Sequence, residues 1–357
     1  MNIHNFSSDL PSHHTPEKKQ NDFHKDLEFI KDTIIENHPG VYNKLDPHFS
    51  SQVYKSFRVA QETLNQAHSE KESIQALKTF GKSFNDAHLW VQYDSAKDSI
   101  GYLTTEQVEA KPEAPTFSIQ CSEGGTWITL PTFAPSKNQI VLLEKIISSL
   151  TQHRENTIIF DLRGNGGGNS AFGVDLLKAL FGVEYAEHSL AQQEQNVYIK
   201  WRASSENLEH VKSFLIPMVK QQFSEDHSVV KQIEATYKGM LNAFADGDHY
   251  YIEPKPPETS TDQNISSLFK GEVIAIIDRG CGSACLDFLD GLKAMLSKVT
   301  FVGESTEADS VYMELRTVKL PSLKGTFGFP IKVYLNRPRG HNIPYLPDVK
   351  YNKDLTL

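Results

Sequence analysis

Residues 158–168 read Ile-Ile-Phe-Asp-Leu-Arg-Gly-Asn-Gly-Gly-Gly, an apolar run of strand length that leads directly into a glycine-rich loop. The run predicts a buried strand, and the glycines predict a loop at its carboxyl end. Because glycine has no side chain, such a loop exposes backbone N–H groups that can hold an anion. The structural alternative is a tight turn that needs positive φ. No Gly-Lys-Ser/Thr follows, and the GxGxxG pattern fails at Asn169, which argues against a phosphate site.

Outward from this stretch, strand patterns alternate with helix patterns. Helices are expected at 140–150, 171–181 and 284–296, and strands at 126–130, 157–162, 273–278 and 300–302. A series of short strands from Tyr312 to Tyr334 is expected to close the chain. Since strands that alternate with helices form parallel sheets through crossover connections, the predicted fold class is α/β.

The N-terminal part has a helical pattern instead. Residues 22–85 carry apolar side chains at three- and four-residue steps, and the strand pattern Leu89–Tyr93 follows. We therefore divide the chain into a flexible tail (1–21), a helical N-terminal domain (22–93) and an α/β core (94–357). Within the core, residues 94–115 are loop-rich, and residues 206–245 are expected to form a helical insertion that acts as a lid.

The composition indicates a soluble globular protein. Of 357 residues, 39% are hydrophobic and 23% are charged, and the net charge is 36 − 45 = −9 without long blocks of one sign. Nucleic acids and anionic membranes bind clustered Lys and Arg, so neither is an expected partner. No apolar run approaches the roughly 20 residues of a membrane helix. The first 20 residues lack the apolar region of an intact secretory signal.

The chain has three cysteines, Cys121, Cys281 and Cys285. An odd number cannot form a complete disulfide framework, and the CxxxC pair lacks the second half of a zinc site. We interpret Cys281 and Cys285 as small core residues, and we predict no metal and no cofactor.

Ser283 is the candidate nucleophile. Residues 278–285 read Asp-Arg-Gly-Cys-Gly-Ser-Ala-Cys, between a buried strand and a helix, so Ser283 lies at the helix N-terminus. There the unpaired N–H groups and the positive end of the helix dipole favour an oxyanion beside the hydroxyl. The alternative is a plain N-cap, because serine is common at that position. The segment is not the GxSxG elbow.

A nucleophilic serine needs a base, and the chain has 14 histidines. His13, His14, His24 and His68 lie in the tail or on polar helix faces and are expected to be solvated. His88 is different, since it lies where the helical part gives way to the first strand, in the stretch Asp86-Ala-His-Leu.

Together these segments resemble one family. Asp86-Ala-His-Leu, the Asp161–Gly168 loop, Gly282-Ser-Ala-Cys, Gly303-Glu-Ser-Thr and Pro347-Asp-Val follow in the order of the S41 peptidases, which include C-terminal-processing and tricorn-core proteases. The resemblance covers roughly residues 25–350. It implies a ClpP/crotonase-like α/β core behind a helical N-terminal domain, a serine endopeptidase activity, and a protein or peptide substrate. Family habit also implies a periplasmic or secreted location.

The resemblance assigns roles to particular residues. In one branch a lysine base stands three positions after the Gly-x-x-Thr motif, but here that position is Asp309. The tricorn-like branch instead implies His88 as the base. It also implies an oxyanion hole made by the Ala284 amide with that of Gly167 or Gly168. Asp161 and Arg163 are expected to brace the glycine loop as an ion pair.

The group that orients His88 is left open. The glutamate that the tricorn-like enzymes place before the closing Pro-Asp motif is missing, since residues 339–344 contain no acid. Asn342 is one candidate, and Glu304, Asp309 or Glu314 are the others.

Three other functions remain alternatives. The first is an S41-like module that binds an apolar ligand, as retinoid-binding modules do, and the second is a catalytically impaired scaffold. The third is an acyl-CoA enzyme of the crotonase type, against which the lack of a basic cluster argues. Residues 94–125 are too few for a PDZ module, so the core and the insertion are expected to select the substrate.

Overall fold

The computed structural model describes residues 16–93, 116–256 and 265–351 and contains a mostly parallel sheet with flanking helices. Its strand order is β11-β8-β7-β4-β3-β2, and every neighbouring pair except β2–β3 is parallel. The strands are β2 (Ser118–Ser122), β3 (Gly125–Thr129), β4 (Ile158–Asp161), β7 (Val273–Ile277), β8 (Thr300–Gly303) and β11 (Val349–Lys350). This confirms the α/β class and the four core strands expected from the sequence.

Helices flank this sheet at the three ranges that the sequence predicts and also at residues 183–194, where no helix was expected. They are α4 (Lys137–Leu150), α5 (Ser170–Phe181), α6 (Val183–Glu194) and α10 (Ala284–Met295). Phe288 of α10 anchors the hydrophobic core between helix and sheet, since its ring packs edge-on against Phe160 of β4 at 5.1 Å. Gly173 of α5 faces the same ring, with room for only a tight methyl contact at 3.3 Å, so α5 and α10 approach closely.

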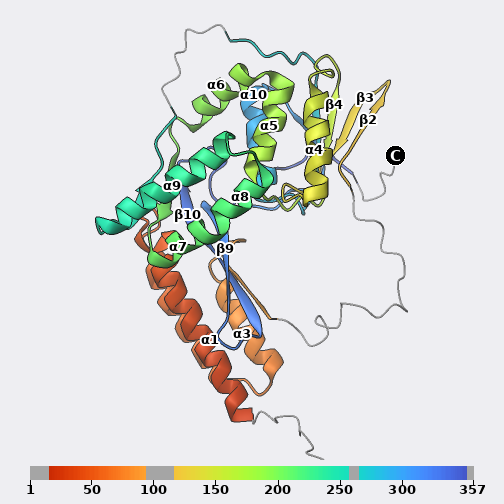
Figure 1. The fold of residues 1–357 in the computed structure, drawn as a ribbon. Helices are drawn as coiled ribbons and strands as arrows, with labels where there is room; N and C mark the ends of the chain where they lie inside the picture. The colour runs from red at the N-terminus through yellow and green to blue at the C-terminus, as the bar shows by residue number, and fades with distance from the viewer. Residues whose placement is uncertain (1–15, 94–115, 257–264, 352–357) are drawn as a thin grey trace, which may run out of the picture.

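A second, antiparallel sheet was not predicted. It joins β1 (Trp90–Tyr93), β10 (Gly325–Leu335), β5 (Tyr198–Arg202) and β6 (Tyr250–Ile252), with β9 (Tyr312–Lys319) also paired to β10. Strands occupy the stretch from Tyr312 to Tyr334, as expected, but they are not a series of short ones. That stretch forms two long strands of one hairpin, whose tip reaches down beside α1 and α3 (Figure 1).

The N-terminal helices are α1 (Pro16–Asn37), α2 (Phe49–Gln66) and α3 (Glu70–Lys82), with a short 3-10 turn at Pro39–Tyr42. This confirms the helical prediction, although α1 begins inside the predicted tail; residues 1–15 lie outside the described part of the chain. The helices do not have a core of their own. Phe23 and Leu27 of α1 belong to one buried cluster with Phe327 and Phe329 of β10.

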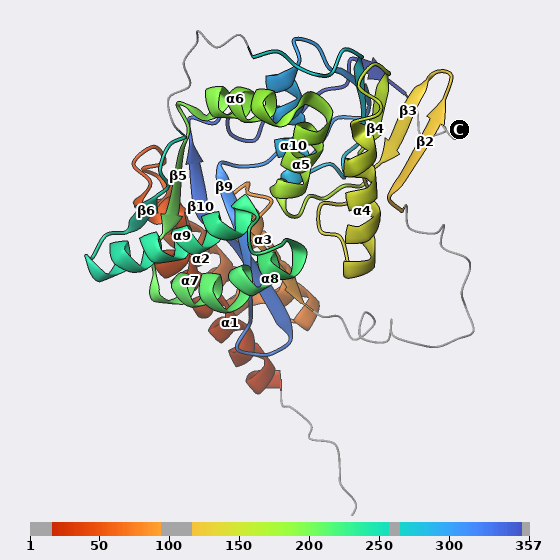
Figure 2. The same cartoon turned by 45° about the horizontal axis from the view of Figure 1, so that its top comes forward.

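The predicted insertion is helical, as expected. It contains α7 (Ser205–His210), a π-helical turn (Val211–Leu215), α8 (Ile216–Gln222) and α9 (Ser228–Ala245). These helices lie beside the second sheet (Figure 2), and Val211 and Met240 are fully buried in its cluster. Their role as a lid stays a prediction, and the loop prediction for 94–115 lies outside the described residues. Over the described ranges, no helix combines the length and apolarity needed to cross a bilayer.

The two hydrophobic clusters do not correspond to two consecutive parts of the chain. One cluster lies around the parallel sheet, and the other unites the N-terminal helices with the antiparallel sheet. Ser283 precedes α10 of the first, whereas His88 precedes β1 of the second. The connector 304–311 runs from β8 to β9 and so crosses between them.

Candidate active site

Ser283 adopts a backbone conformation that is unusual for any residue except glycine. Its φ is 53° and its ψ is −123°, at the junction between β7 and α10. Such a conformation costs on the order of 1–3 kcal/mol and persists only where the surroundings impose it. The side chain makes no capping hydrogen bond to the helix. The N-cap interpretation therefore does not account for this serine.

The glycine loop packs directly against the serine. A β-carbon placed on Gly167 would lie 2.8 Å from both the Ser283 β-carbon and the Ala284 nitrogen, and Gly167 has a φ of 91°. Gly168 has a φ of 136°, and a β-carbon there would lie 2.1 Å from the Phe133 carbonyl carbon. Both positions need glycine for two reasons, the positive φ and the close approach of backbone.

Hydrogen bonds within and around the loop determine which amides are available. The Asn165 side chain accepts the Gly167 N–H at 2.9 Å and donates to the Leu130 carbonyl at 2.8 Å. The Gly168 N–H has no hydrogen-bond partner within the described ranges. The Ala284 N–H, first in its helix, has none there either, as expected for a helix N-terminus. Of the three oxyanion-hole candidates, Ala284 and Gly168 thus have free amides.

The predicted ion pair of the loop is confirmed. Arg163 donates from Nη2 to Asp161 Oδ2 at 2.6 Å and from Nε to Oδ1 at 2.8 Å. This two-pronged contact lies at the carboxyl end of β4, where the glycine loop begins.

His88 is buried at the end of the turn that follows α3, with 8% of its surface exposed. Its backbone N–H donates to Asp86 Oδ1 at 2.9 Å, and its ring Nδ1 lies 3.7 Å from the same oxygen. Burial alone would lower the pKa of His88. The attraction of Asp86, together with the charges of Asp309 and Glu307, outweighs that effect and raises the pKa above its usual 6.5.

Asp309 is the predicted candidate that lies between the two halves of the site. Its Oδ1 accepts the Ser283 backbone N–H at 3.2 Å, and its Oδ2 lies 3.7 Å from Arg339 Nη1. The carboxylate is buried, which raises its pKa, while the charges of His88 and Arg339 act in the opposite direction. Asp309 therefore accepts a hydrogen bond from the backbone of the candidate nucleophile, and its negative charge raises the pKa of the candidate base, His88.

The other candidates for orienting His88 have different partners. Glu304 lies 3.6 Å from Arg279, and Glu314 lies 3.3 Å from Lys332. Asn342 donates from Nδ2 to the Asn85 carbonyl at 2.8 Å, which brings it to the turn but not into a hydrogen bond with the ring. In the described part of the chain, no hydrogen bond joins the Ser283 hydroxyl to His88 either. Such bonds are often formed only when substrate is present.

Two acidic residues of the site were missed. Among the ion pairs of the described residues, the carboxylate that pairs with the His88 ring is that of Asp86. The sequence marked Asp86 only as part of a motif. Glu307 carries its carboxylate over Gly282, where a β-carbon would lie 2.3 Å from its Oε2. Burial, followed by the charge of Asp309, raises the pKa of Glu307. The signal in the sequence that could have identified Glu307 was its position between the Gly303-Glu-Ser-Thr motif and Asp309.

Cys281 and Cys285 are core residues, as expected, and they form a disulfide with each other, which the sequence left open. Cys281 lies in the loop and Cys285 in the first turn of α10. Their α-carbons are 5.5 Å apart, which is within the usual range for a disulfide. Both are fully buried, and Cys121 is the exposed free thiol.

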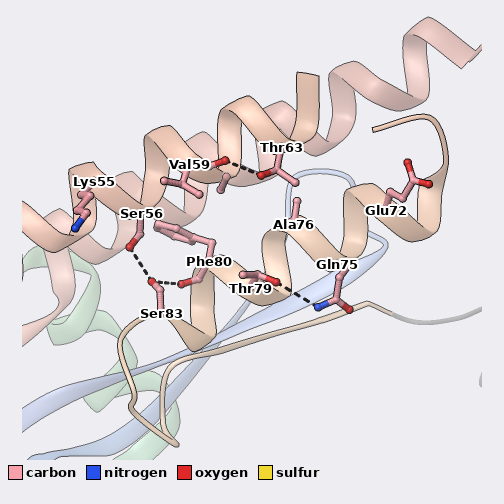
Figure 3. A pocket seen from close by; sticks show the side chains of 11 residues that line it. Lys55, Ser56, Val59, Thr63, Glu72, Gln75, Ala76, Thr79, Phe80 and Ser83 are labelled. Carbon is pink, nitrogen blue, oxygen red and sulfur yellow. Dashed lines mark hydrogen bonds between the residues drawn. The ribbon is translucent and has the colours of Figure 1, made fainter. Parts of the chain in front are cut away.

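A pocket of about 310 Å³ lies elsewhere, between α2 and α3 (Figure 3). Its apolar wall includes Val59, Ala60, Ala76 and Phe80, while Ser283, His88 and Asp309 are not among the residues that line it. In the described ranges, no group of His, Cys, Asp and Glu is placed to hold a metal ion.

Comparison with known proteins identifies the family. A serine at a strand–helix junction, in contact with a glycine loop, is typical of serine hydrolases. The profile of peptidase family S41 matches residues 126–350, more than half of the chain, so the chain belongs to this family and is a serine peptidase.

Solved structures support the fold. The chain is similar to mature CPAF complexed with lactacystin, with a TM-score of 0.57, 12% identity, and coverage of 93% of this chain and 94% of that one. For mature CPAF, the TM-score is 0.54 with 11% identity and 93% coverage of each chain. Among curated protein sequences, no significant match is found.

The contact between the glycine loop and the serine makes a first prediction. Gly167→Ala is expected to lower peptidase activity by about 100-fold, because its methyl group displaces the Ser283–Ala284 backbone by a fraction of an ångström or more. Gly166→Ala is the matched control, since a β-carbon there meets nothing within 4 Å and the φ is ordinary. Activity assays with melting curves measure both effects. Equal activity of the two variants would contradict the assigned contact.

The raised pKa of His88 makes a second prediction. A histidine acts as a base only when it is neutral, so kcat/KM is expected to rise with pH through a midpoint above 6.5. Asp309→Asn removes a facing negative charge but keeps an acceptor for the Ser283 N–H, so the midpoint moves to lower pH. Glu304→Gln, whose native partner is Arg279, leaves it unchanged. A midpoint that moves with Glu304 and not with Asp309 would refute this electrostatic account.

Proposed function

We propose that this serine peptidase cleaves peptide bonds within protein or peptide chains through an acyl-enzyme on Ser283, with His88 as general base. The observation that carries the proposal is the strained backbone of Ser283. A serine at positive φ, without a capping bond and followed by the free Ala284 amide, has a geometry that helix capping does not require.

The proposed reaction uses these groups in the following order. The Ser283 hydroxyl attacks the substrate carbonyl carbon while His88 takes its proton. The oxyanion accepts hydrogen bonds from the Ala284 and Gly168 amides, and Gly167 keeps the two backbones in contact. The protonated His88 then gives its proton to the leaving amine. Water, deprotonated by His88, attacks the ester and releases the acid and the free serine.

Asp309 and Asp86 are proposed to stabilise the imidazolium that forms on His88. Both carboxylates raise the pKa of the ring, so both favour the protonated state reached after attack. Asp309 also accepts the Ser283 N–H, which ties the position of the negative charge to that of the nucleophile. These two acids take the place of the missing glutamate.

The apolar-ligand function has one observation in its favour, the pocket between α2 and α3. That pocket does not involve Ser283, so a binding module would not require the strained serine. We therefore place peptidase activity first. We also propose that the protein meets its substrate outside the reducing cytoplasm, because disulfides are characteristic of proteins from oxidising compartments.

The proposed roles are tested by removing each side chain and measuring hydrolysis of a fluorescently labelled unfolded protein. Ser283→Ala and His88→Ala are each expected to lower kcat/KM by about 10³-fold or more. Ser148→Ala and His68→Ala, both at exposed positions, are the matched controls and should retain full activity. Cleavage that survives Ser283→Ala in the absence of other proteases would rule out this nucleophile.

A further inference from the structure

We propose that the Cys281–Cys285 disulfide is a positioning element for the nucleophile. It holds the Ser283 backbone at positive φ, so that the hydroxyl stays beside the oxyanion amides. The inference rests on the proposed role of Ser283 and adds a covalent bond that restrains this residue.

The disulfide closes a small ring of residues with Ser283 at its centre. Cys281 lies in the loop, where its N–H donates to the Asp278 carbonyl at 3.0 Å and its carbonyl accepts the Glu307 N–H at 3.0 Å. Cys285 belongs to the first turn of α10. The bond therefore joins the anchored end of the loop to the anchored end of the helix, and the nucleophile lies between the two anchors.

The loop needs such a restraint because its own residues favour other conformations. Gly280 and Gly282 lie on either side of Cys281 and give the backbone more freedom than any other residue type. Ser283 itself prefers negative φ, as residues with a β-carbon do. Without a link between positions 281 and 285, Ser283 can relax toward ordinary helical geometry and extend α10 backwards. Its side chain would then leave the vicinity of Gly167.

Hydrogen bonds hold the loop on both sides of the Ser283 α-carbon. Before it, the Gly282 N–H donates to the Asn165 carbonyl at 3.1 Å, and the Ser283 N–H donates to Asp309. After it, the Ser283 carbonyl accepts the Leu286 N–H at 2.8 Å, and the Cys285 N–H donates to the Gly282 carbonyl at 3.0 Å. The disulfide adds a covalent link across the same atom, and it does so without occupying an N–H group that the oxyanion needs.

Burial distinguishes a permanent restraint from a redox switch. Both cysteines have 0% exposure and belong to the hydrophobic cluster around Phe288 and Leu289. A dithiol reductant must reach a sulfur to transfer two electrons and two protons to the pair while it is itself oxidised to a disulfide. In the folded enzyme these sulfurs are shielded from that attack, so the restraint is constitutive.

The test compares Cys281→Ala/Cys285→Ala with wild type, and Cys121→Ser serves as the control at the exposed thiol. The readouts are the rate constant for modification of Ser283 by a fluorophosphonate, kcat and KM for one peptide, and the melting temperature. Rates are measured well below melting and divided by the folded fraction. The modification rate and kcat are expected to fall about 10- to 100-fold in the double variant, with KM nearly unchanged. Cys121→Ser should match wild type.

A purely stabilising disulfide gives a different result. The double variant would then melt at a lower temperature but react at the wild-type rate per folded molecule, which would overturn the proposal. Rapid inactivation of folded wild type by dithiothreitol, with thiols appearing at both positions, would overturn the constitutive restraint. If the double alanine variant does not fold, Cys281→Ala/Cys285→Val refills the lost volume and is measured in the same way. Failure of wild type itself to react would instead count against the proposed nucleophile.

Discussion

The hydrogen bond from the Ser283 amide to the Asp309 carboxylate is the contact on which the site depends. It joins a loop of the parallel sheet to the connector that leads into the antiparallel sheet. A buried carboxylate is costly unless it is paired, and here the amide, Arg339 and His88 offset part of that cost, although burial still raises the pKa of Asp309. The same charge therefore positions the nucleophile and prepares the base for protonation.

The two sheets bring together residues from opposite ends of the chain. β1, directly after His88, pairs with β10 in the register Trp90 to Gly328, so a C-terminal strand determines where the histidine turn lies. On the other side, Gly167 and Ser283 meet because β4 and β7 are neighbours in the parallel sheet. The relative position of the two hydrophobic clusters then sets the geometry between base and nucleophile. A mutation that shifts one cluster against the other is expected to affect activity before it affects either fold.

Local patterns in the sequence predict the parallel sheet, most of its helices and the loops that carry Gly167 and Ser283. Buried strands and helices give apolar runs and stripes, and flexible loops give clusters of glycine. The pairing of β1 with β10 leaves no such pattern, since a short strand such as β1 does not specify a partner that lies far away in the chain. Spacing likewise cannot choose among Glu304, Asp309 and Asn342. Only the path of the connector brings Asp309 to the Ser283 amide. The sequence left the disulfide state open, because the number of cysteines does not show which of them meet, whereas in the structure the four-residue separation across a helix start suits a disulfide.

The central claim is that Ser283 is the residue that becomes acylated, and peptide mapping by mass spectrometry after reaction with a fluorophosphonate tests it most directly. The account predicts one phosphonyl group per folded molecule, on the peptide that contains Ser283, and no modification after Ser283→Ala. It also predicts slow modification in His88→Ala, because the hydroxyl then lacks its base. A phosphonyl group on another residue, or none on a folded and otherwise competent enzyme, would contradict the account.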